Sequence, residues 1–149
     1  MVGGYVSGSE DLRRFALNKS RTLLLSGSHP PPVTAACIAA LEVVEKEPEH
    51  LENLWKNTRY FKKELKRMGF DIGNSETPIT PVIVGESSVA QSMSIMLYDE
   101  GVFALPIVFP MVARDKARIR TMMNAGHARA DLDMALAAFE KIGRKLRVL

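Results

Sequence analysis

The chain has 149 residues, 46% of them hydrophobic and 25% charged, and its 20 Lys and Arg against 17 Asp and Glu give a formal charge of +3. This is the composition of a folded globular domain, and a chain of this length can build one hydrophobic core without disulfides or bound metal ions. The single cysteine excludes a disulfide framework, the absence of a long apolar run excludes a membrane helix, and the dispersed basic residues argue against a nucleic-acid-binding protein.

The first third of the chain predicts a short strand followed by helices. Small and apolar residues alternate over residues 2–7, as in a strand or hairpin arm. Ser9 is a suitable N-cap for a helix over residues 10–19, and residues 21–28 read as an extended stretch that ends at three prolines. Apolar residues at helical spacing then predict a helix over residues 33–46, in which Cys37 is expected to be a buried thiol rather than a nucleophile.

The remainder predicts a small sheet covered by helices. Pro48 ends the preceding helix, and an amphipathic helix is expected over residues 50–68 with Gly69 as its C′ residue. Strands are expected over 78–85, 102–109 and 117–123, with a helix ending at Gly101 and an amphipathic helix lined by Leu132 to Leu146. This order predicts an α/β or α+β fold. Five methionines are expected to fill the core, at positions 93, 96, 111, 122 and 123.

Two features could carry chemistry. Arg118 and Arg120 alternate along a strand and therefore project to the same face, where each needs either an external anion or an internal carboxylate. The residues Ser26-Gly27-Ser28 precede the proline run at a helix N-terminus, where hydroxyl and backbone N–H groups could receive a phosphate or simply cap a loop. The three histidines lack the spacing of metal ligands, so no metal site is expected.

Six stretches that cover nearly the whole chain, in order, resemble one family. They are residues 3–8, 25–31, 75–86, 100–104, 117–120 and 131–149. On them the chain resembles the C-terminal part of the α-oxoamine synthases, which are pyridoxal-phosphate acyltransferases with the aspartate aminotransferase fold. The segments Glu76-Thr-Pro-Ile79 and Glu100-Gly-Val-Phe103 are most similar to the glycine C-acetyltransferase branch of that family.

The resemblance implies roles for particular residues. Arg120 matches the arginine that holds the amino-acid carboxylate, and Ser26 and Gly27 match residues that reach across a dimer interface to the phosphate of pyridoxal 5′-phosphate in the other subunit. The lysine that forms a Schiff base with this cofactor is expected upstream of Met1. We therefore assign no catalytic residue within this chain and expect the chain alone to be inactive.

The resemblance also implies a domain organisation. Residues 1–48 would be the tail of the large cofactor-binding domain together with the connecting helix. The helices of this segment would lie at an interface. Residues 49–149 would be the small C-terminal α/β domain, with a mostly antiparallel sheet. Departures from the family pattern lie at Gly27, at His29, at the loop 112–115, which replaces a Val-Pro-x-Gly sequence, and at Ala128, which stands where a threonine would cap the last helix.

The implied activity is the joining of acetyl-CoA and glycine to give 2-amino-3-ketobutyrate, in a homodimer or higher oligomer without nucleic-acid or membrane partners. Since the first residues lack a basic and apolar leader, we expect a cytoplasmic location. Two alternatives stay open. One is a fragment of an acyltransferase similar to 8-amino-7-oxononanoate synthase, and the other is a non-catalytic α/β module that self-associates.

Overall fold

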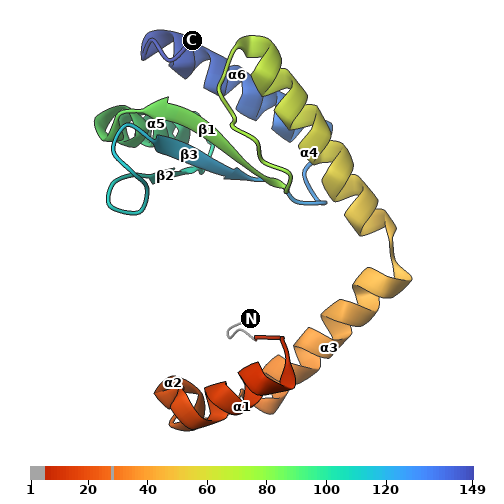
Figure 1. Cartoon of the computed structure of the whole chain (residues 1–149). Helices are drawn as coiled ribbons and strands as arrows, with labels where there is room; N and C mark the ends of the chain where they lie inside the picture. The colour runs from red at the N-terminus through yellow and green to blue at the C-terminus, as the bar shows by residue number, and fades with distance from the viewer. Residues whose placement is uncertain (1–5, 28) are drawn as a thin grey trace. The chain divides into compact units, whose positions relative to one another are not determined.

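The computed structural model describes residues 6–27 and 29–149, which form two compact units, Met1–Glu47 and Pro48–Leu149. The first unit contains helices α1 (Glu10–Lys19), α2 (Arg21–Leu24) and α3 (Pro31–Lys46) (Figure 1). Among the helices of the described ranges, none combines the length and the apolar character needed to cross a membrane.

The ends of the first helices are fixed by serine caps. As predicted, Ser9 caps α1, its hydroxyl accepting a hydrogen bond from the Leu12 N–H at 3.2 Å. The prediction of an extended stretch from residue 21 is wrong. The Ser20 hydroxyl accepts a hydrogen bond from the Leu23 N–H at 3.3 Å and caps the short helix α2. Of the strand predicted over residues 2–7, residues 2–5 lie outside the described part of the chain, and Val6 and Ser7 are in no strand.

The helices of the first unit have no core of their own. No residue of α1, α2 or α3 is buried, and the predicted apolar stripe of α3 is exposed, with Leu41 at 66% and Val44 at 57%. The expectation of a buried Cys37 is therefore wrong for this chain, since that thiol lies on the same uncovered helix and is exposed. An apolar surface of this kind is typical of an interface.

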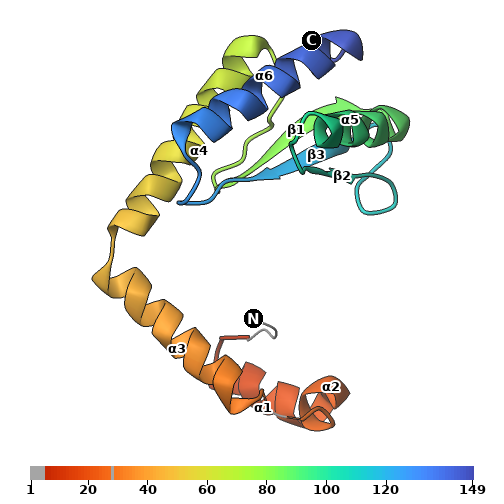
Figure 2. The ribbon, with the colours of Figure 1, turned by 180° about the vertical axis from the view of Figure 1, so that it is seen from behind.

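The second unit contains a three-stranded antiparallel sheet in the order β1-β3-β2 (Figure 2). Its strands are β1 (Ile79–Gly85), β2 (Leu105–Ile107) and β3 (Ala117–Met122), and its helices are α4 (Glu49–Met68), α5 (Ser87–Asp99) and α6 (Arg129–Lys145). Gly69 ends α4 in the left-handed conformation, at φ 102°, as the sequence predicts. The predicted fold class, a small antiparallel sheet with helices, is confirmed.

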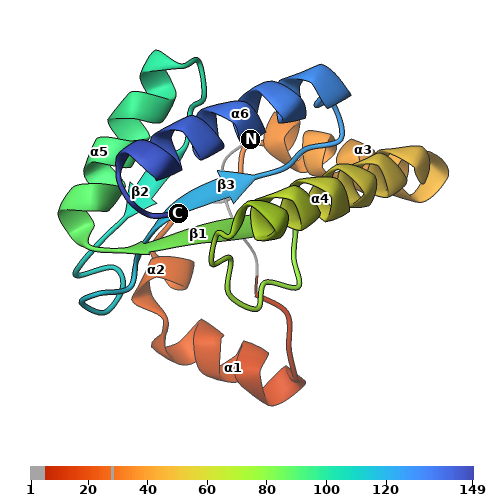
Figure 3. The same cartoon turned by 90° about the horizontal axis from the view of Figure 1, so that it is seen from above.

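All three helices pack on one face of the sheet. Figure 3 shows α6 between α4 and α5 over the strands. Val82 of β1 and Ile119 of β3 are fully buried under Met93 and Leu97 of α5 and Phe139 of α6. Because strand residues alternate between faces, the neighbours of these core residues project to the opposite face of the sheet.

Three expectations about the second unit are corrected. Strand β2 covers only Leu105–Ile107 rather than 102–109, since the chain turns from Val108 onward. Two of the five methionines expected in the core are exposed, Met111 at 66% and Met122 at 58%, because one lies in a loop and the other on the outward face of β3. Met93 is buried as expected.

Candidate functional site

Arg120 lies at the centre of the outward face of the sheet. It occupies the middle strand, β3, where its neighbours in register are Pro81 on β1 and Leu105 on β2. Arg118 lies on the same face, as the strand alternation predicts, between Ile83 and Ile107. The sequence pattern thus brings two guanidinium groups to an otherwise apolar strand surface.

The alternative of an internal salt bridge is not realised within the described residues. The Arg118 Nε donates to the Lys116 carbonyl at 3.0 Å, and Arg120 has neither an ion pair nor a hydrogen bond in the described part of the chain. Both flanking positions of Arg120 in the register carry apolar residues, so no carboxylate lies beside it. Arg120 is exposed, so its guanidinium is available to a carboxylate from outside this chain.

The loop before β3 holds a strained residue. Asp115 has φ 60°, in the left-handed region that glycine adopts without cost and that aspartate tolerates better than most residues. By the family resemblance, glycine is the usual residue at this position, and glycine adopts such a φ without a steric cost. Arg114 from the same loop lies 4.4 Å from the centre of the Phe109 ring, which holds its side chain by a cation–π contact.

The loop that contains Ser26 and Gly27 is open. The Ser26 hydroxyl donates to the Thr22 carbonyl, and apart from Gly27 and its two chain neighbours no described atom lies within 4 Å of the position that a Cβ on Gly27 would take. Another molecule could therefore approach the backbone at Gly27 closely. Ser28, the third residue of this segment, lies outside the described residues.

Helix α3 itself supplies few donors to this loop. Pro31 and Pro32 carry no N–H, and the Val33 and Thr34 N–H groups both point to the Pro30 carbonyl, at 2.9 and 3.3 Å. The expectation of free N–H groups at this helix end is therefore wrong for its first turn. A phosphate would have to be held by the loop groups, namely the Ser26 hydroxyl and the Gly27 N–H.

Sequence reasoning missed a polar cluster between α4 and α6. The Tyr60 hydroxyl donates to the Asp133 carboxylate, and Arg129 Nε lies 3.1 Å from the same oxygen while its guanidinium lies 3.3 Å from the centre of the Tyr60 ring. The hydrogen bond from Tyr60 is the main cause that lowers the pKa of Asp133, and the same bond raises the pKa of Tyr60. Because 73 residues separate the two partners, no local spacing could have signalled this contact.

A second polar contact joins α4 to the segment that leads into β1. The Lys62 Nζ donates to the Ser75 and Thr77 carbonyls, both at 2.7 Å, and so holds that segment. Partial burial lowers the pKa of Lys62. This lysine has a structural role.

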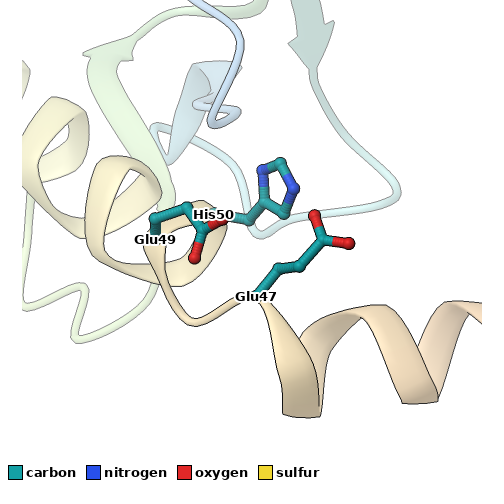
Figure 4. Close-up of side chains that lie close together, drawn as sticks. All are labelled: Glu47, Glu49 and His50. Atoms are coloured by element: carbon teal, nitrogen blue, oxygen red, sulfur yellow. The ribbon is translucent and has the colours of Figure 1, made fainter.

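The break between α3 and α4 carries Glu47, Glu49 and His50, which are exposed (Figure 4). Glu47 is the last residue of the first unit, whereas Glu49 and His50 belong to the second. We therefore assign no metal site to these three residues.

Comparisons with known proteins cover the chain from end to end. A family model described as aminotransferase class I and II matches residues 1–139. The 8-amino-7-oxononanoate synthase of Symbiobacterium thermophilum is 54% identical over 149 residues, which is 100% of this chain and 38% of the relative. A Thermus thermophilus protein named 8-amino-7-oxononanoate synthase/2-amino-3-ketobutyrate coenzyme A ligase is 51% identical over 148 residues, again 38% of its own length.

Solved structures of similar proteins also match most of the chain. A serine palmitoyltransferase from S. paucimobilis with bound PLP-myriocin matches with a TM-score of 0.82 and 27% identity, over 91% of this chain and 35% of that one. This chain thus spans little more than a third of the length of the proteins it matches.

Proposed function

The chain belongs to the aminotransferase class I and II family, and on this premise we propose that it is the C-terminal part of a pyridoxal-phosphate-dependent acyltransferase of the 8-amino-7-oxononanoate synthase type. The observation that carries the proposal is the free guanidinium of Arg120 at the centre of an open, apolar sheet face. A guanidinium in that setting suits a substrate that bears a carboxylate.

The choice within the family differs from the one that the sequence favoured. The segments around Glu76 and Glu100 suggested the glycine C-acetyltransferase branch, whereas the relatives at 54% and 51% identity both carry the name 8-amino-7-oxononanoate synthase. The 2-amino-3-ketobutyrate reaction, from glycine and acetyl-CoA, is the second candidate, because the Thermus relative carries both names.

Arg120 would bind and orient the amino-acid substrate. Pyridoxal phosphate, when bound, supplies the electron sink that makes the α-carbon of an amino acid acidic. A planar guanidinium can donate two parallel hydrogen bonds to the substrate carboxylate, which fixes the rotation of the substrate as a single point charge would not. Pro81 and Leu105 on either side offer no competing carboxylate. The proposed role of Arg120 is therefore orientation of the reacting carbon.

Ser26 and Gly27 would hold the cofactor phosphate. Their chemistry fits, since the hydroxyl and the Gly27 N–H are hydrogen-bond donors and the space beside Gly27 is open. The Ser26 hydroxyl would exchange its bond to the Thr22 carbonyl for one to a phosphate oxygen. By the family resemblance, this phosphate belongs to the cofactor of the other subunit of a homodimer. The uncovered apolar residues of α3 support an association of this kind.

We also propose that residues 1–48 are the tail of the large cofactor-binding domain with its connecting helix, and that residues 49–149 are the small domain. The observed boundary between the two compact units, at Glu47 and Pro48, lies one residue from this division.

The proposal is tested with a chimera, in which this chain replaces the 148 matched residues of the Thermus relative. That host suits the experiment because its name includes both candidate reactions. The chimera is given the amino acids and acyl thioesters of both reactions, and the two amino-ketone products are quantified by mass spectrometry. We expect 8-amino-7-oxononanoate to exceed 2-amino-3-ketobutyrate by about tenfold, the scale on which pocket contacts discriminate between substrates.

Two results would count against the proposal. An excess of 2-amino-3-ketobutyrate would favour the second candidate. Formation of neither product by a folded chimera, while the unaltered host forms its products under the same conditions, would contradict the acyltransferase assignment itself.

A further inference from the structure

The outward face of β3 carries a second arginine whose charge the proposed function does not use. Arg118 lies two residues before Arg120, and the alternation of side chains along a strand places both on this face. Arg118 is half-buried, and Ile83 on β1 and Ile107 on β2 flank it in register, so neither neighbouring strand places a carboxylate beside it. A cation in such surroundings favours the approach of an anion.

The Arg118 guanidinium is oriented but not neutralised. Its Nε donates to the Lys116 carbonyl at 3.0 Å, and this is its one hydrogen bond within the described ranges of the chain. A carbonyl oxygen carries no formal charge, so the bond directs the guanidinium and leaves its positive charge in place. The terminal nitrogen atoms of Arg118 can therefore donate parallel hydrogen bonds to a carboxylate from another molecule.

The spacing of the two arginines sets the kind of molecule that can meet both. Two residues of an antiparallel strand span about 7 Å. Lys116 precedes Arg118 in the chain whereas Arg120 follows it, so the bond to the Lys116 carbonyl draws the Arg118 guanidinium away from Arg120. A ligand of both groups thus carries two anionic groups that are separated by more than about 7 Å.

The proposed reaction supplies two carboxylates at this separation. In 8-amino-7-oxononanoate the ketone is at carbon 7, which is the former acyl carbon of the thioester, so the acyl part ends in the carboxylate of carbon 1. Six carbon–carbon bonds join these two carbons, and two more lead to the carboxyl carbon of the amino acid, a span of about 10 Å in an extended chain. The acetyl group of the second candidate reaction has no such carboxylate.

Charge decides in which direction along β3 the acyl chain runs from Arg120. On one side the next outward residue is Met122, which borders a cavity of about 320 Å³ that Asp131 also lines. The Asp131 carboxylate disfavours an acyl chain that ends in a carboxylate of its own. On the other side Arg118 attracts that end, and the apolar neighbours of Arg118 in register can contact the methylene groups of the chain.

We propose that Arg118 determines the specificity for the acyl substrate, by binding the terminal carboxylate of a dicarboxylic acyl thioester. This inference rests on the proposed function, in which Arg120 binds the carboxylate of the amino acid. Arg118 has no part in holding the amino acid. Its role is to favour an acyl chain that ends in a carboxylate over an uncharged chain of the same length.

The test uses the Thermus chimera that carries this chain, with two coenzyme A thioesters of equal chain length. Heptanedioyl-CoA ends in a carboxylate and heptanoyl-CoA in a methyl group, and kcat/KM is measured for each with the same amino acid. Arg118→Met keeps an unbranched apolar stem but removes the charge. In this variant kcat/KM for heptanedioyl-CoA should fall roughly tenfold, and that for heptanoyl-CoA by less than about twofold.

Arg114→Met is the matched control, because it removes a cation of the same type from the loop before β3. The Arg114 guanidinium lies over the Phe109 ring, so the ratio of the two kcat/KM values should change by less than about twofold. An equal change of this ratio in both variants would assign the effect to the general positive charge. Equal losses on both thioesters in Arg118→Met would assign Arg118 a structural role, and either result would overturn the proposal.

Charge reversal provides a second test. In Arg118→Glu the introduced carboxylate should repel heptanedioyl-CoA and favour 7-aminoheptanoyl-CoA, whose terminal ammonium can pair with it, so the order of kcat/KM for these two thioesters should be reversed. An unaltered chimera that forms no product with any thioester would contradict the proposed function and, with it, this inference. A chimera that forms product but keeps its order of preference in Arg118→Glu would overturn the role of Arg118 alone.

Discussion

At the residue scale, the contacts that set side-chain chemistry join positions far apart in the sequence. Asp133 is the clearest case, since its pKa lies below its ordinary value of 3.8 mainly because the Tyr60 hydroxyl donates to it. The alternation of a strand was enough to predict that Arg118 and Arg120 share a face. It could not show that Arg120 lacks an internal carboxylate, because that depends on which residues β1 and β2 place beside it.

We expect Tyr60→Phe to raise the pKa of Asp133 toward its ordinary value. The pKa is measured from the pH dependence of the Asp133 ¹³Cγ shift. Because the folded-state pKa is lowered, the bond stabilises the fold above the unfolded-state pKa, and this contribution is lost as the pH falls through the folded-state value. The stability difference between wild type and variant should therefore disappear on acidification. Tyr98→Phe on α5, away from Asp133, is the matched control, and an equal shift in both variants would contradict the assigned cause.

At the element scale, long amphipathic helices could be predicted and short elements could not. Helices α1, α4 and α6 carry several turns of periodic apolar residues or a recognisable cap, so their limits follow from the sequence. Helix α2 has four residues and depends on the Ser20 cap, and β2 has three residues whose extent is set by pairing with β3. Such elements are fixed by contacts that no local pattern contains.

The N-terminus of α6 offers a test at this scale. Its N-cap, Ala128, has no side chain to accept the N–H groups of the first turn, although Asp131 already accepts the Ala128 N–H. Ala128→Thr should complete a reciprocal capping pair and raise the free energy of unfolding by about 1 kcal/mol.

Urea denaturation measures the change. Ala137→Thr, at an exposed position in the middle of the same helix, is the control and should lower stability by a few tenths of a kcal/mol, roughly 0.5, from helix propensity alone. A loss of stability in both variants would show that the Ala128 position cannot accept a capping hydroxyl.

At the scale of the whole molecule, the buried residues that the structure describes all belong to the second unit. Within residues 6–27 and 29–149, the buried core residues run from Phe61 to Ile142, and none belongs to α1, α2 or α3. The apolar spacing over residues 33–46 predicted a helix in which Cys37 would be buried. It could not show that the apolar residues of this helix remain uncovered, because helical spacing does not specify the element that packs against it.

This distribution predicts that residues Pro48–Leu149 fold on their own. The urea midpoint of this fragment should lie within about 10% of that of the full chain. The midpoint is the free energy of unfolding divided by its dependence on urea concentration, and both quantities follow the surface buried on folding. Residues 1–47 alone should lack a cooperative transition, because isolated helices of this length are marginal in water. Loss of cooperative unfolding in Pro48–Leu149 would mean that the first unit contributes to the core after all.

The central claim is that Arg120 holds a substrate carboxylate, and the Michaelis constant for the amino acid in the Thermus chimera tests it most directly. Arg120→Lys keeps the charge but loses the guanidinium fork, so this constant should rise by roughly tenfold or more. Arg118→Lys, on the same face but with its Nε bonded to Lys116, is the matched control and should change it by less than about threefold. Equal effects of the two substitutions, or no effect of Arg120→Lys, would contradict the account.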